Sequence, residues 1–445
     1  MTATTADTIA AIATPPGRGA VGIVRIAGPA AAAIAAALTG ACPPPRTAAV
    51  TAVTDAAGRA MDKCVALFFP APASYTGDDV VELHTHGAPL VLDQVVARAI
   101  QLGARAARPG EFTERAFLNG KLDLAQAEAV ADLINAGTEA AARSAANALG
   151  GALSDKVNAI AAALTDVRVA VEASLDFPDE APDAETVAAD VEAAAAKVEA
   201  LINSARQGQL LRDGMTVALA GAPNAGKSSL LNTLAGRDRA IVSGEPGTTR
   251  DVVDADISVD GMPLRVVDTA GLRAAAAGVE AEGVRRATKA MAAADRVLLV
   301  CDDADPGAEA PALVRRRLPA DAAVTLVWNK IDLSGRAAGM ADAGTVAVSA
   351  KTGAGVDALR GHLKQCMGFR GVEDSPFLAR RRHLDALGRC RESLRAAGAV
   401  LTDGGAVELA AEDLRLAHRA LGEITGAVGS EELLGKIFAE FCVGK

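Results

Sequence analysis

Residues Gly221-Ala-Pro-Asn-Ala-Gly-Lys-Ser228 decide the fold of the central part of this chain. They fit the pattern G-x-x-x-x-G-K-[ST], in which glycines let the backbone close around phosphate and loop N–H groups cradle it. The apolar run 215–220 before this octapeptide is typical of a buried strand, and residues 228–234 after it are typical of the first turns of a helix. Strand, loop and helix in this order predict a nucleoside triphosphate site.

The side chains of this loop have predicted roles. Lys227 is expected to reach the β- and γ-phosphates as a catalytic charge, and the Ser228 hydroxyl is expected to ligate Mg²⁺. The N-terminus of the following helix adds positive potential. We expect the loop to bind the nucleotide through Asn224, Ala225, Gly226, Lys227, Ser228 and Ser229.

Two later stretches, each after a strand-like run, predict which base is bound. The Asp332 carboxylate of Asn329-Lys330-Ile331-Asp332 can accept hydrogen bonds from both N1–H and N2–H₂ of guanine, a pair of donors that adenine does not offer. Ser349-Ala350-Lys351 is expected to supply backbone contacts to the guanine carbonyl. Such segments meet at the carboxyl edge of a parallel sheet. The sequence therefore predicts GTP rather than ATP.

A third strand-like run, 264–267, ends in Asp268-Thr269-Ala270-Gly271. Asp268 is expected to hold Mg²⁺ through water, and the Gly271 N–H to sense the γ-phosphate. The pair Asp260-Gly261 before this run predicts a hairpin, and so one antiparallel strand in an otherwise parallel sheet. That mixed sheet is typical of small GTPases.

Leu272 follows Gly271, where Ras-like proteins have a glutamine that orients the attacking water. Leucine cannot hydrogen-bond, so other residues must assist catalysis. Thr249 is placed to ligate Mg²⁺, and Glu280 could position the water or simply be a solvated helix residue. Arg250 and Arg273 could stabilise charge, although arginines beside such switches are more often surface residues.

Composition and the pattern of apolar residues divide the 445 residues into four parts. Half of the residues are hydrophobic and 22% are charged, which predicts two to four globular domains. Short apolar runs with proline and glycine punctuation predict an α+β domain over 1–120. Helical patterns fill 121–212 and 369–445, and the GTPase domain occupies 213–368. The economical arrangement is one discontinuous all-α domain with a Ras-like α/β P-loop GTPase domain inserted into it.

Helix boundaries follow from periodicity and capping residues. Ser375-Pro376 fits an N-cap with proline at the first helical position. The predicted helices of the two all-α parts are 124–148, 153–175, 185–211, 376–397, 408–424 and 430–441.

The net charge and the spacing of the cysteines limit the kinds of partner and site that the chain can have. The net charge of −10 does not exclude a local basic strip, Arg380-Arg381-Arg382, that could meet nucleic acid. Six scattered cysteines without a C-x-x-C pair disfavour a zinc ribbon or disulfide scaffold and fit a reducing cytoplasm. The longest apolar stretch, 29–38, is too short to span a bilayer, so no membrane is predicted.

The order of these motifs, with Leu272 in place of glutamine, resembles the MnmE (TrmE) family of tRNA modification GTPases. Four stretches outside the nucleotide motifs carry the resemblance. They are DTI (7–9) with ATPPGRGAVGI (13–23) and Arg25, SYTGDDVVE (74–82) with His86-Gly87, RPGEFTERAFLNGKLDL (108–124), and FCVGK (441–445).

The resemblance implies a cytoplasmic homodimer with a folate-binding-like N-terminal domain that takes a 5-formyltetrahydrofolate-type one-carbon donor. With an MnmG-type flavoprotein it would install an aminomethyl or carboxymethylaminomethyl group at C5 of the wobble uridine of certain tRNAs. By matching motif, the folate residues would be Arg25, Glu82, Lys121 and Lys445, each of which taken alone could be a surface charge.

The resemblance also implies a cation in place of the missing glutamine. K⁺ would be held by Asn224 and by a loop that contributes Ser243, Glu245 and Thr248. Ser243, Thr248, Thr249, Asp268, Thr269, Ala270 and Gly271 would join the GTP contacts, with Ser228 and Thr249 on Mg²⁺. Glu280 would match the residue that orients water, and pairing of two G domains would complete the site.

Cys442 matches a family cysteine and could act at the uridine or simply be packed. Two other readings of the chain stay open. One is a ribosome-assembly or translation GTPase switch that performs no modification chemistry, although neither a KH-type module nor a second G domain is evident in the sequence. The other is a dimeric scaffold that only recruits a modifying enzyme.

Overall fold

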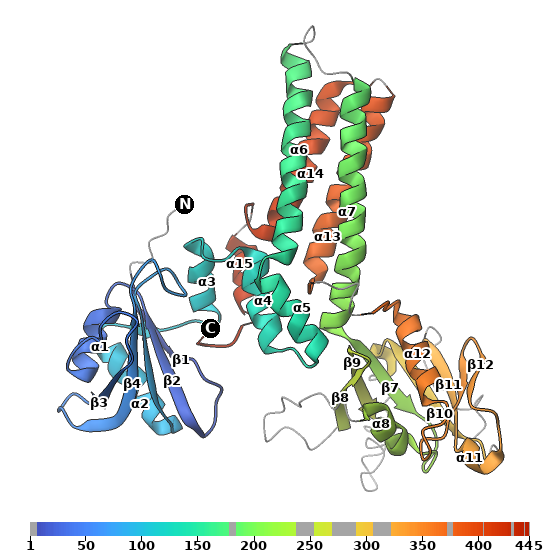
Figure 1. The fold of residues 1–445 in the computed structure, drawn as a ribbon, viewed down its shortest axis with the longest axis horizontal. Coiled ribbons are helices and arrows are strands. Elements are labelled where there is room, and N and C mark those ends of the chain that lie inside the picture. Colours follow the sequence, from blue (N-terminus) through green and yellow to red (C-terminus); the bar gives the residue numbers. More distant parts are fainter. Residues whose placement is uncertain are drawn as a thin grey trace. The chain divides into compact units, whose positions relative to one another are not determined.

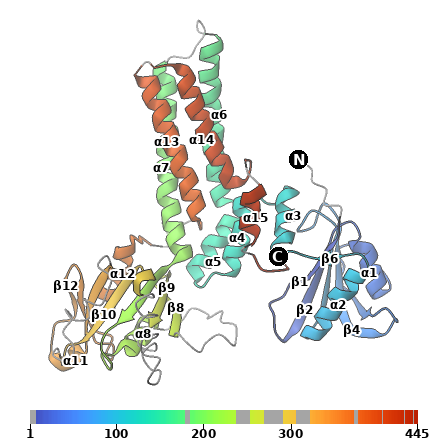
Figure 2. The same ribbon diagram turned by 180° about the vertical axis from the view of Figure 1, so that it is seen from behind.

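The structure is a computed structural model that describes residues 7–177, 184–236, 253–268, 291–305, 322–371, 377–403, 405–428, 431–439 and 441–444 (Figures 1 and 2). The chain forms two compact units. The first contains Met1–Ala131 and Arg419–Lys445, and the second contains Asp132–His418.

The first unit is built on a six-stranded sheet with strand order β3-β4-β5-β2-β1-β6. β1 and β6 are parallel, and the other neighbours are antiparallel. The strands are β1 Ile9–Ile12, β2 Gly19–Ala27, β3 Ala49–Thr54, β4 Ala60–Phe69, β5 Val80–Gly87 and β6 Arg105–Ala106. Helices α1 Ala31–Thr39 and α2 Pro89–Gln101 share one core with the sheet (Figure 1).

Alternation along β2 decides which side chains face that core. Val24 and Ile26 are fully buried and belong to it. Arg25 lies between them, and because successive strand residues point to opposite faces, its side chain lies on the other face of the sheet. Glu82 is its register partner on β5. The period-2 pattern thus places this charged pair on the face of the sheet opposite α1 and α2.

A buried ionic network holds α3 Glu111–Leu118 to the sheet. The Arg115 side chain, 1% exposed, donates to the backbone O of Asp7 at 3.0 Å and to its Oδ1 at 2.8 Å. Arg105 donates to both oxygens of the buried Glu111 carboxylate. Burial alone raises the pKa of Glu111, but hydrogen bonds from Arg105 and from the Arg108 N–H hold it below its usual 4.5. Its contribution to stability is therefore present above pH 4.5 and is lost as the pH falls through the lowered value.

The end of the chain packs on the same unit. α15 Glu431–Ala439 lies against α3. Phe438 and Phe441 pack with Leu124 and Ala127 of α4 Leu124–Ile134. The periodicity of the sequence predicted α15 as a helix but did not indicate this packing partner.

The helical part of the second unit contains α5 Glu139–Leu149, α6 Ala152–Asp176, α7 Ala184–Asp213, α13 Arg381–Thr402 and the first part of α14 Val407–Thr425. α6 and α13 both pack along α7 (Figure 2). The single helix predicted over 124–148 was wrong. The chain leaves the helix after Ile134, and the Thr138 hydroxyl accepts a hydrogen bond from the Ala141 N–H at 3.1 Å to cap α5.

The predicted start of α13 was also wrong, because the helix begins at Arg381 instead of residue 376. Phe377 and Leu378 are buried outside the helix, and the Leu378 N–H donates to the Ser144 carbonyl oxygen. The Arg380 N–H donates to His383 Nδ1 at 3.1 Å as part of a capping box. Tertiary burial and this cap therefore fix the start, and Ser375-Pro376 lies outside the described residues.

The part of the second unit that contains the octapeptide is a seven-stranded sheet with order β12-β13-β11-β10-β7-β9-β8. β7, β9, β10, β11 and β13 are parallel, and β8 and β12 are antiparallel edge strands. The strands are β7 Met215–Ala220, β8 Val253–Val259, β9 Met262–Asp268, β10 Arg296–Asp302, β11 Val324–Asn329, β12 Gly339–Asp342 and β13 Thr345–Ala347. The helices are α8 Lys227–Ala235, α11 Ile331–Ser334 and α12 Val356–Met367.

The predicted hairpin between β8 and β9 is confirmed. Asp260 and Gly261 have φ of 51° and 89°, the positive values that a tight two-residue turn of this kind requires. β12 was not predicted, because it is a short, polar edge strand without an apolar pattern. The sheet is therefore mixed at both edges.

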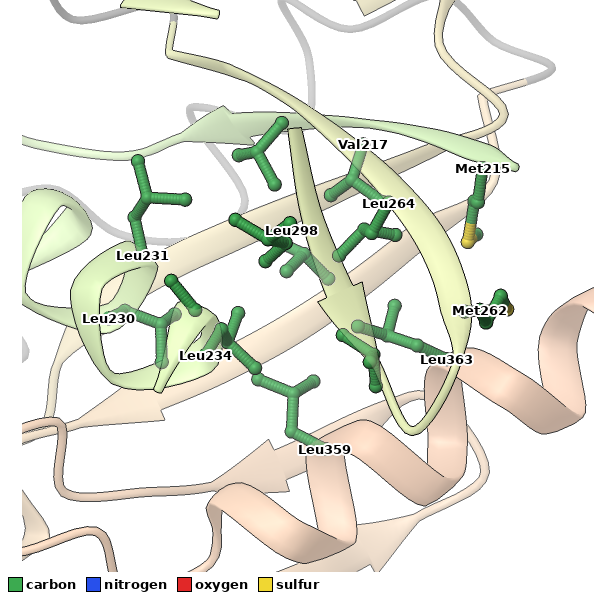
Figure 3. Packing of buried hydrophobic residues seen from close by; sticks show 14 of the residues in the cluster. Met215, Val217, Leu230, Leu231, Leu234, Met262, Leu264, Leu298, Leu359 and Leu363 are labelled. Carbon is green, nitrogen blue, oxygen red and sulfur yellow. The ribbon is translucent and has the colours of Figure 1, made fainter. Parts of the chain in front are cut away.

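One core joins the sheet to α8 and α12 (Figure 3). Leu230 and Leu234 of α8 and Leu359 and Leu363 of α12 are fully buried in it. β7 contributes Met215, Val217 and Leu219 to this core, whereas Ala218 and Ala220 lie in a separate cluster on the other face. Because both faces of β7 are buried, its sequence is a continuous apolar run. This packing fixes the strand end and the helix start that flank the octapeptide.

We predict that Arg115→Met strongly destabilises the first unit. The change leaves the buried Glu111 carboxylate without one of its cationic neighbours, and breaking a buried pair costs about 3–5 kcal/mol. Hydrogen exchange of the β1 amides in the full chain measures the loss. Arg59→Met is the matched control, because Arg59 is 81% exposed and, among the described residues, pairs only with Asp55 at the surface, where such an ion pair contributes little. Equal exchange rates for the two variants would contradict the role given to the network.

Candidate nucleotide-binding site

The octapeptide loop joins β7 to α8 in a conformation that its glycines permit. Gly221 and Gly226 have φ of +143° and +92°. A Cβ atom on Gly221 would lie 2.1 Å from the Val300 carbonyl oxygen, and one on Gly226 would lie 2.2 Å from Asn329 Nδ2. The neighbouring strands β10 and β11 therefore require glycine at both positions, in addition to the demands of the turn.

Lys227 is held inside this loop. Its side chain is buried, and Nζ donates to the carbonyl oxygens of Gly221 at 3.0 Å and Ala222 at 2.7 Å. Ser228 and Ser229 are exposed in the first turn of α8. A cation, exposed hydroxyls and a helix N-terminus thus gather where the sequence predicted the phosphates, and these groups suit a polyphosphate with a hard divalent cation.

The Asn329 side chain ties three loops together. Its Nδ2 donates to the Ala225 carbonyl oxygen at 2.9 Å, and its Oδ1 accepts from the Ala350 N–H at 3.0 Å. The side chain is 1% exposed, so both bonds are shielded from water. One amide therefore joins the phosphate loop to both segments predicted to contact the base.

The base-recognition residues lie beside this amide. Ser349 Oγ donates to Oδ1 of the exposed Asp332 carboxylate at 2.6 Å, which orients it. Lys330 has φ of +66°, and its Nζ lies 2.6 Å from Asp302 Oδ2. Burial raises the pKa of Asp302, but the hydrogen bonds from Lys330 and from the Ala304 N–H, together with the Lys330 charge, hold that pKa below its usual value. Ile331 anchors the segment in the core.

The structure adds residues that the sequence analysis missed. Asp302 is the last residue of β10 and Asp303 follows it, and both side chains contact the segment after β11. Two acidic residues directly after an apolar run, at the carboxyl end of a parallel strand, were the signal that could have found them.

Several predicted residues lie outside the described residues, namely Ser243, Glu245, Thr248, Thr249, Thr269, Ala270, Gly271 and Glu280, together with Arg250, Leu272 and Arg273. The backbone of Asp268 is described and pairs with Leu219 of β7. That pairing brings the end of β9 beside the start of the phosphate loop.

In the first unit, the structure brings Arg25 and Glu82 together. Arg25 Nε donates to Glu82 Oε1 at 2.9 Å, and His84 Nε2 lies 3.1 Å from Glu82 Oε2. The Tyr75 and Phe112 ring centroids lie 5.5 Å and 5.6 Å from the Arg25 guanidinium carbon. The sequence analysis assigned no role to Tyr75, Phe112 or His84.

Arg25 and Glu82 were predicted to act together with Lys121 and Lys445, and Cys442 was predicted separately for the uridine. Lys121 is exposed after α3, and no contact of the described residues joins it to Arg25 or Glu82. Cys442 is exposed, and its carbonyl oxygen accepts from the Gly110 N–H at 3.3 Å. Lys445 lies outside the described residues.

The basic strip Arg380-Arg381-Arg382 does not form one exposed surface. Arg380 is buried and lies 2.9 Å from Asp132 Oδ1, which also accepts from Arg212 Nε. Its predicted role toward nucleic acid was therefore wrong, because the guanidinium joins helices of the bundle.

Two features are absent from the described ranges. No helix in them is long and apolar enough to cross a membrane. The same parts of the chain contain no group of three or more His, Cys, Asp or Glu that could hold a metal ion.

Comparisons with known proteins extend over nearly all of the chain. The family described as "GTP-binding protein TrmE N-terminus" matches residues 8–121, and the family described as "MnmE helical domain" matches residues 124–442. The tRNA modification GTPase MnmE of Alkalilimnicola ehrlichii is 53% identical over 444 residues, which cover 98% of this chain and 99% of that protein. The tRNA modification GTPase MnmE of Pseudomonas syringae pv. tomato is 52% identical over 452 residues, with 99% of each chain covered.

Among solved structures, the G domain of the T. maritima FeoB iron transporter is 27% identical, covers 34% of this chain and 98% of its own, and has a TM-score of 0.27. The relatives of known function match this chain from end to end, and the family matches include both its N-terminal and its helical parts. The chain belongs to the MnmE family of tRNA modification GTPases.

Proposed function

We propose that this tRNA modification GTPase couples GTP hydrolysis to the installation of an aminomethyl or carboxymethylaminomethyl group at C5 of the wobble uridine of certain tRNAs, together with an MnmG-type flavoprotein. The observation that carries the GTPase half is the Asn329 amide, which joins the phosphate loop to the base loops. The modification half is supported by the end-to-end match to tRNA modification GTPases.

Phosphoryl transfer requires neutralisation of developing charge more than covalent chemistry. Lys227 supplies one charge inside the loop. Ser228, Thr249 and Asp268 would hold Mg²⁺, which adds positive charge between the phosphates when bound. Asp332 accepts from the guanine edge, held in orientation by Ser349.

A second cation would replace the missing glutamine. Asn224 is exposed in the phosphate loop and has φ of +64°, so its side chain is available to a ligand at the loop rim. Together with Ser243, Glu245 and Thr248 it would hold K⁺, whose charge would stabilise the transition state. Glu280 would position the water, and pairing of two G domains in a homodimer would close the site.

Folate binding is supported by the cluster around Arg25. Glu82 offers carboxylate oxygens to the N–H donors of a pterin ring, and Tyr75, which is 37% exposed, supplies aromatic surface beside it. Lys121 and Lys445 would meet the acidic tail of a 5-formyltetrahydrofolate-type donor. Cys442 is a possible group at the uridine, and it is exposed, whereas burial raises the pKa of the Cys64 and Cys390 thiols to about 11 and about 12.

We predict that purified protein hydrolyses GTP at least about tenfold faster in KCl than in NaCl at equal ionic strength, because one catalytic charge of this size corresponds to roughly 1.4 kcal/mol or more. Asn224→Ala should remove the difference between the two salts. Steady-state phosphate release measures both rates. The same rate in both salts for the unmodified protein would take K⁺ out of the mechanism and revive the reading as an externally activated switch.

We predict that Glu82→Gln weakens binding of 5-formyltetrahydrofolate about tenfold, because a charged acceptor is lost. Isothermal titration calorimetry measures the affinity. Asp62→Asn is the matched control, since Asp62 forms a second carboxylate and histidine pair on the same sheet, with the exposed His86. If both variants lose affinity equally, or neither does, the folate site is elsewhere.

A further inference from the structure

The segment that carries Asp332 cannot hold its own conformation. α11 is a single four-residue turn, Ile331–Ser334, and helices this short are not stable by themselves. Ile331 is buried, but Leu333 is 66% exposed and adds little core packing. The direction of the Asp332 carboxylate must therefore be set by side-chain contacts to neighbouring elements.

Asp303 supplies such a contact at the carboxyl end of α11. Its side chain is 4% exposed, and Oδ1 accepts from Arg336 Nε at 2.8 Å and lies 2.7 Å from Nη2. Oδ2 accepts from Ser334 Oγ. The Asp303 N–H donates to the Asn329 carbonyl oxygen at 2.8 Å, so this carboxylate stands on a rigid strand end. Buried charge-assisted bonds of this kind fix geometry as well as adding energy.

The preceding residue holds the other side of the turn. Asp302 binds Lys330, the residue directly before α11, as described above. The carboxylates of Asp302 and Asp303, at the end of β10, thus bind the chain on both sides of Asp332. The guanidinium of Arg336 also lies over the Trp328 ring, 5.1 Å from its centroid, which fixes the arginine that holds Asp303.

We propose that Asp303, through Ser334 and Arg336, is a positioning residue that sets guanine specificity by aiming the Asp332 carboxylate at the base. This inference rests on the proposed recognition of guanine by Asp332. A carboxylate that is already oriented loses less conformational entropy when the nucleotide binds. Its fixed direction also favours a base with both N1–H and N2–H₂ donors over a base that lacks the amino group.

The test uses GDP and IDP as probes with the full chain and Mg²⁺. IDP lacks the 2-amino group, so the ratio of the two dissociation constants reports how well Asp332 is aimed. Asp303→Ala should weaken GDP binding about tenfold, equal to about 1.4 kcal/mol, and IDP binding less, so the ratio falls. Asp305→Ala is the matched control, because Asp305 is exposed on the same loop.

A double-mutant cycle separates positioning from general stability. In an Asp332→Ala background, Asp303→Ala should have no further effect on GDP affinity, because the group it positions is gone. The same loss in both backgrounds would overturn the inference and leave the proposed function standing. If Asp332→Ala itself leaves GDP affinity unchanged, the proposed recognition of guanine fails instead.

A second variant and a second readout cover the case in which Asp303→Ala does not fold. Ser334→Ala removes one donor while Arg336 still pairs with the carboxylate, and it should lower the GDP to IDP preference by a smaller factor in the same direction. Trp328 is the only tryptophan of the chain, so its fluorescence reports the position of Arg336. Emission should change in Asp303→Ala and stay constant in Asp305→Ala. Unchanged emission and an unchanged ratio in both Asp303→Ala and Ser334→Ala would refute the positioning role.

Discussion

The side-chain amide of Asn329 is the contact on which the nucleotide site depends. It donates to the phosphate loop and accepts from the loop that follows β13, and it is shielded from water. The backbone carbonyl oxygen of Asn329 accepts a hydrogen bond from the Asp303 N–H. Because buried amide bonds are costly to leave unmade, the three loops hold one another in place. The phosphate end and the base end of the site therefore form one unit.

Parallel strands explain why so much chemistry gathers at this edge. β7, β10 and β11 are parallel, so each ends at the same side of the sheet, and each leads into a loop of the nucleotide site. The core beneath them, shared with α8 and α12, fixes where each strand ends. Because this core fixes the strand ends, the order of the strands in the sheet determines how far apart the functional groups after them lie.

Local signals in the sequence predicted the phosphate loop, the strand and helix around it, and the hairpin at Asp260-Gly261, because each depends on neighbouring residues. Contacts between distant residues could not be predicted in this way. Arg380 was predicted to lie on a basic surface strip, yet its guanidinium donates a hydrogen bond to Asp132, which is 248 positions away in the sequence. The start of α13, before which Leu378 bonds to Ser144, and the position of α11, which Asp303 contacts, depend on similar tertiary contacts.

Asn329 joins the phosphate end and the base end of the nucleotide site. Calorimetric titration of Asn329→Ala with GDP and with inorganic pyrophosphate, both with Mg²⁺, measures how far each end depends on this amide. Pyrophosphate has no base, so its affinity should fall about tenfold together with that of GDP only if the amide supports the phosphate loop. Asn232→Ala, an exposed change on α8, should leave both affinities unchanged. Loss of GDP affinity with unchanged pyrophosphate affinity would contradict the claim.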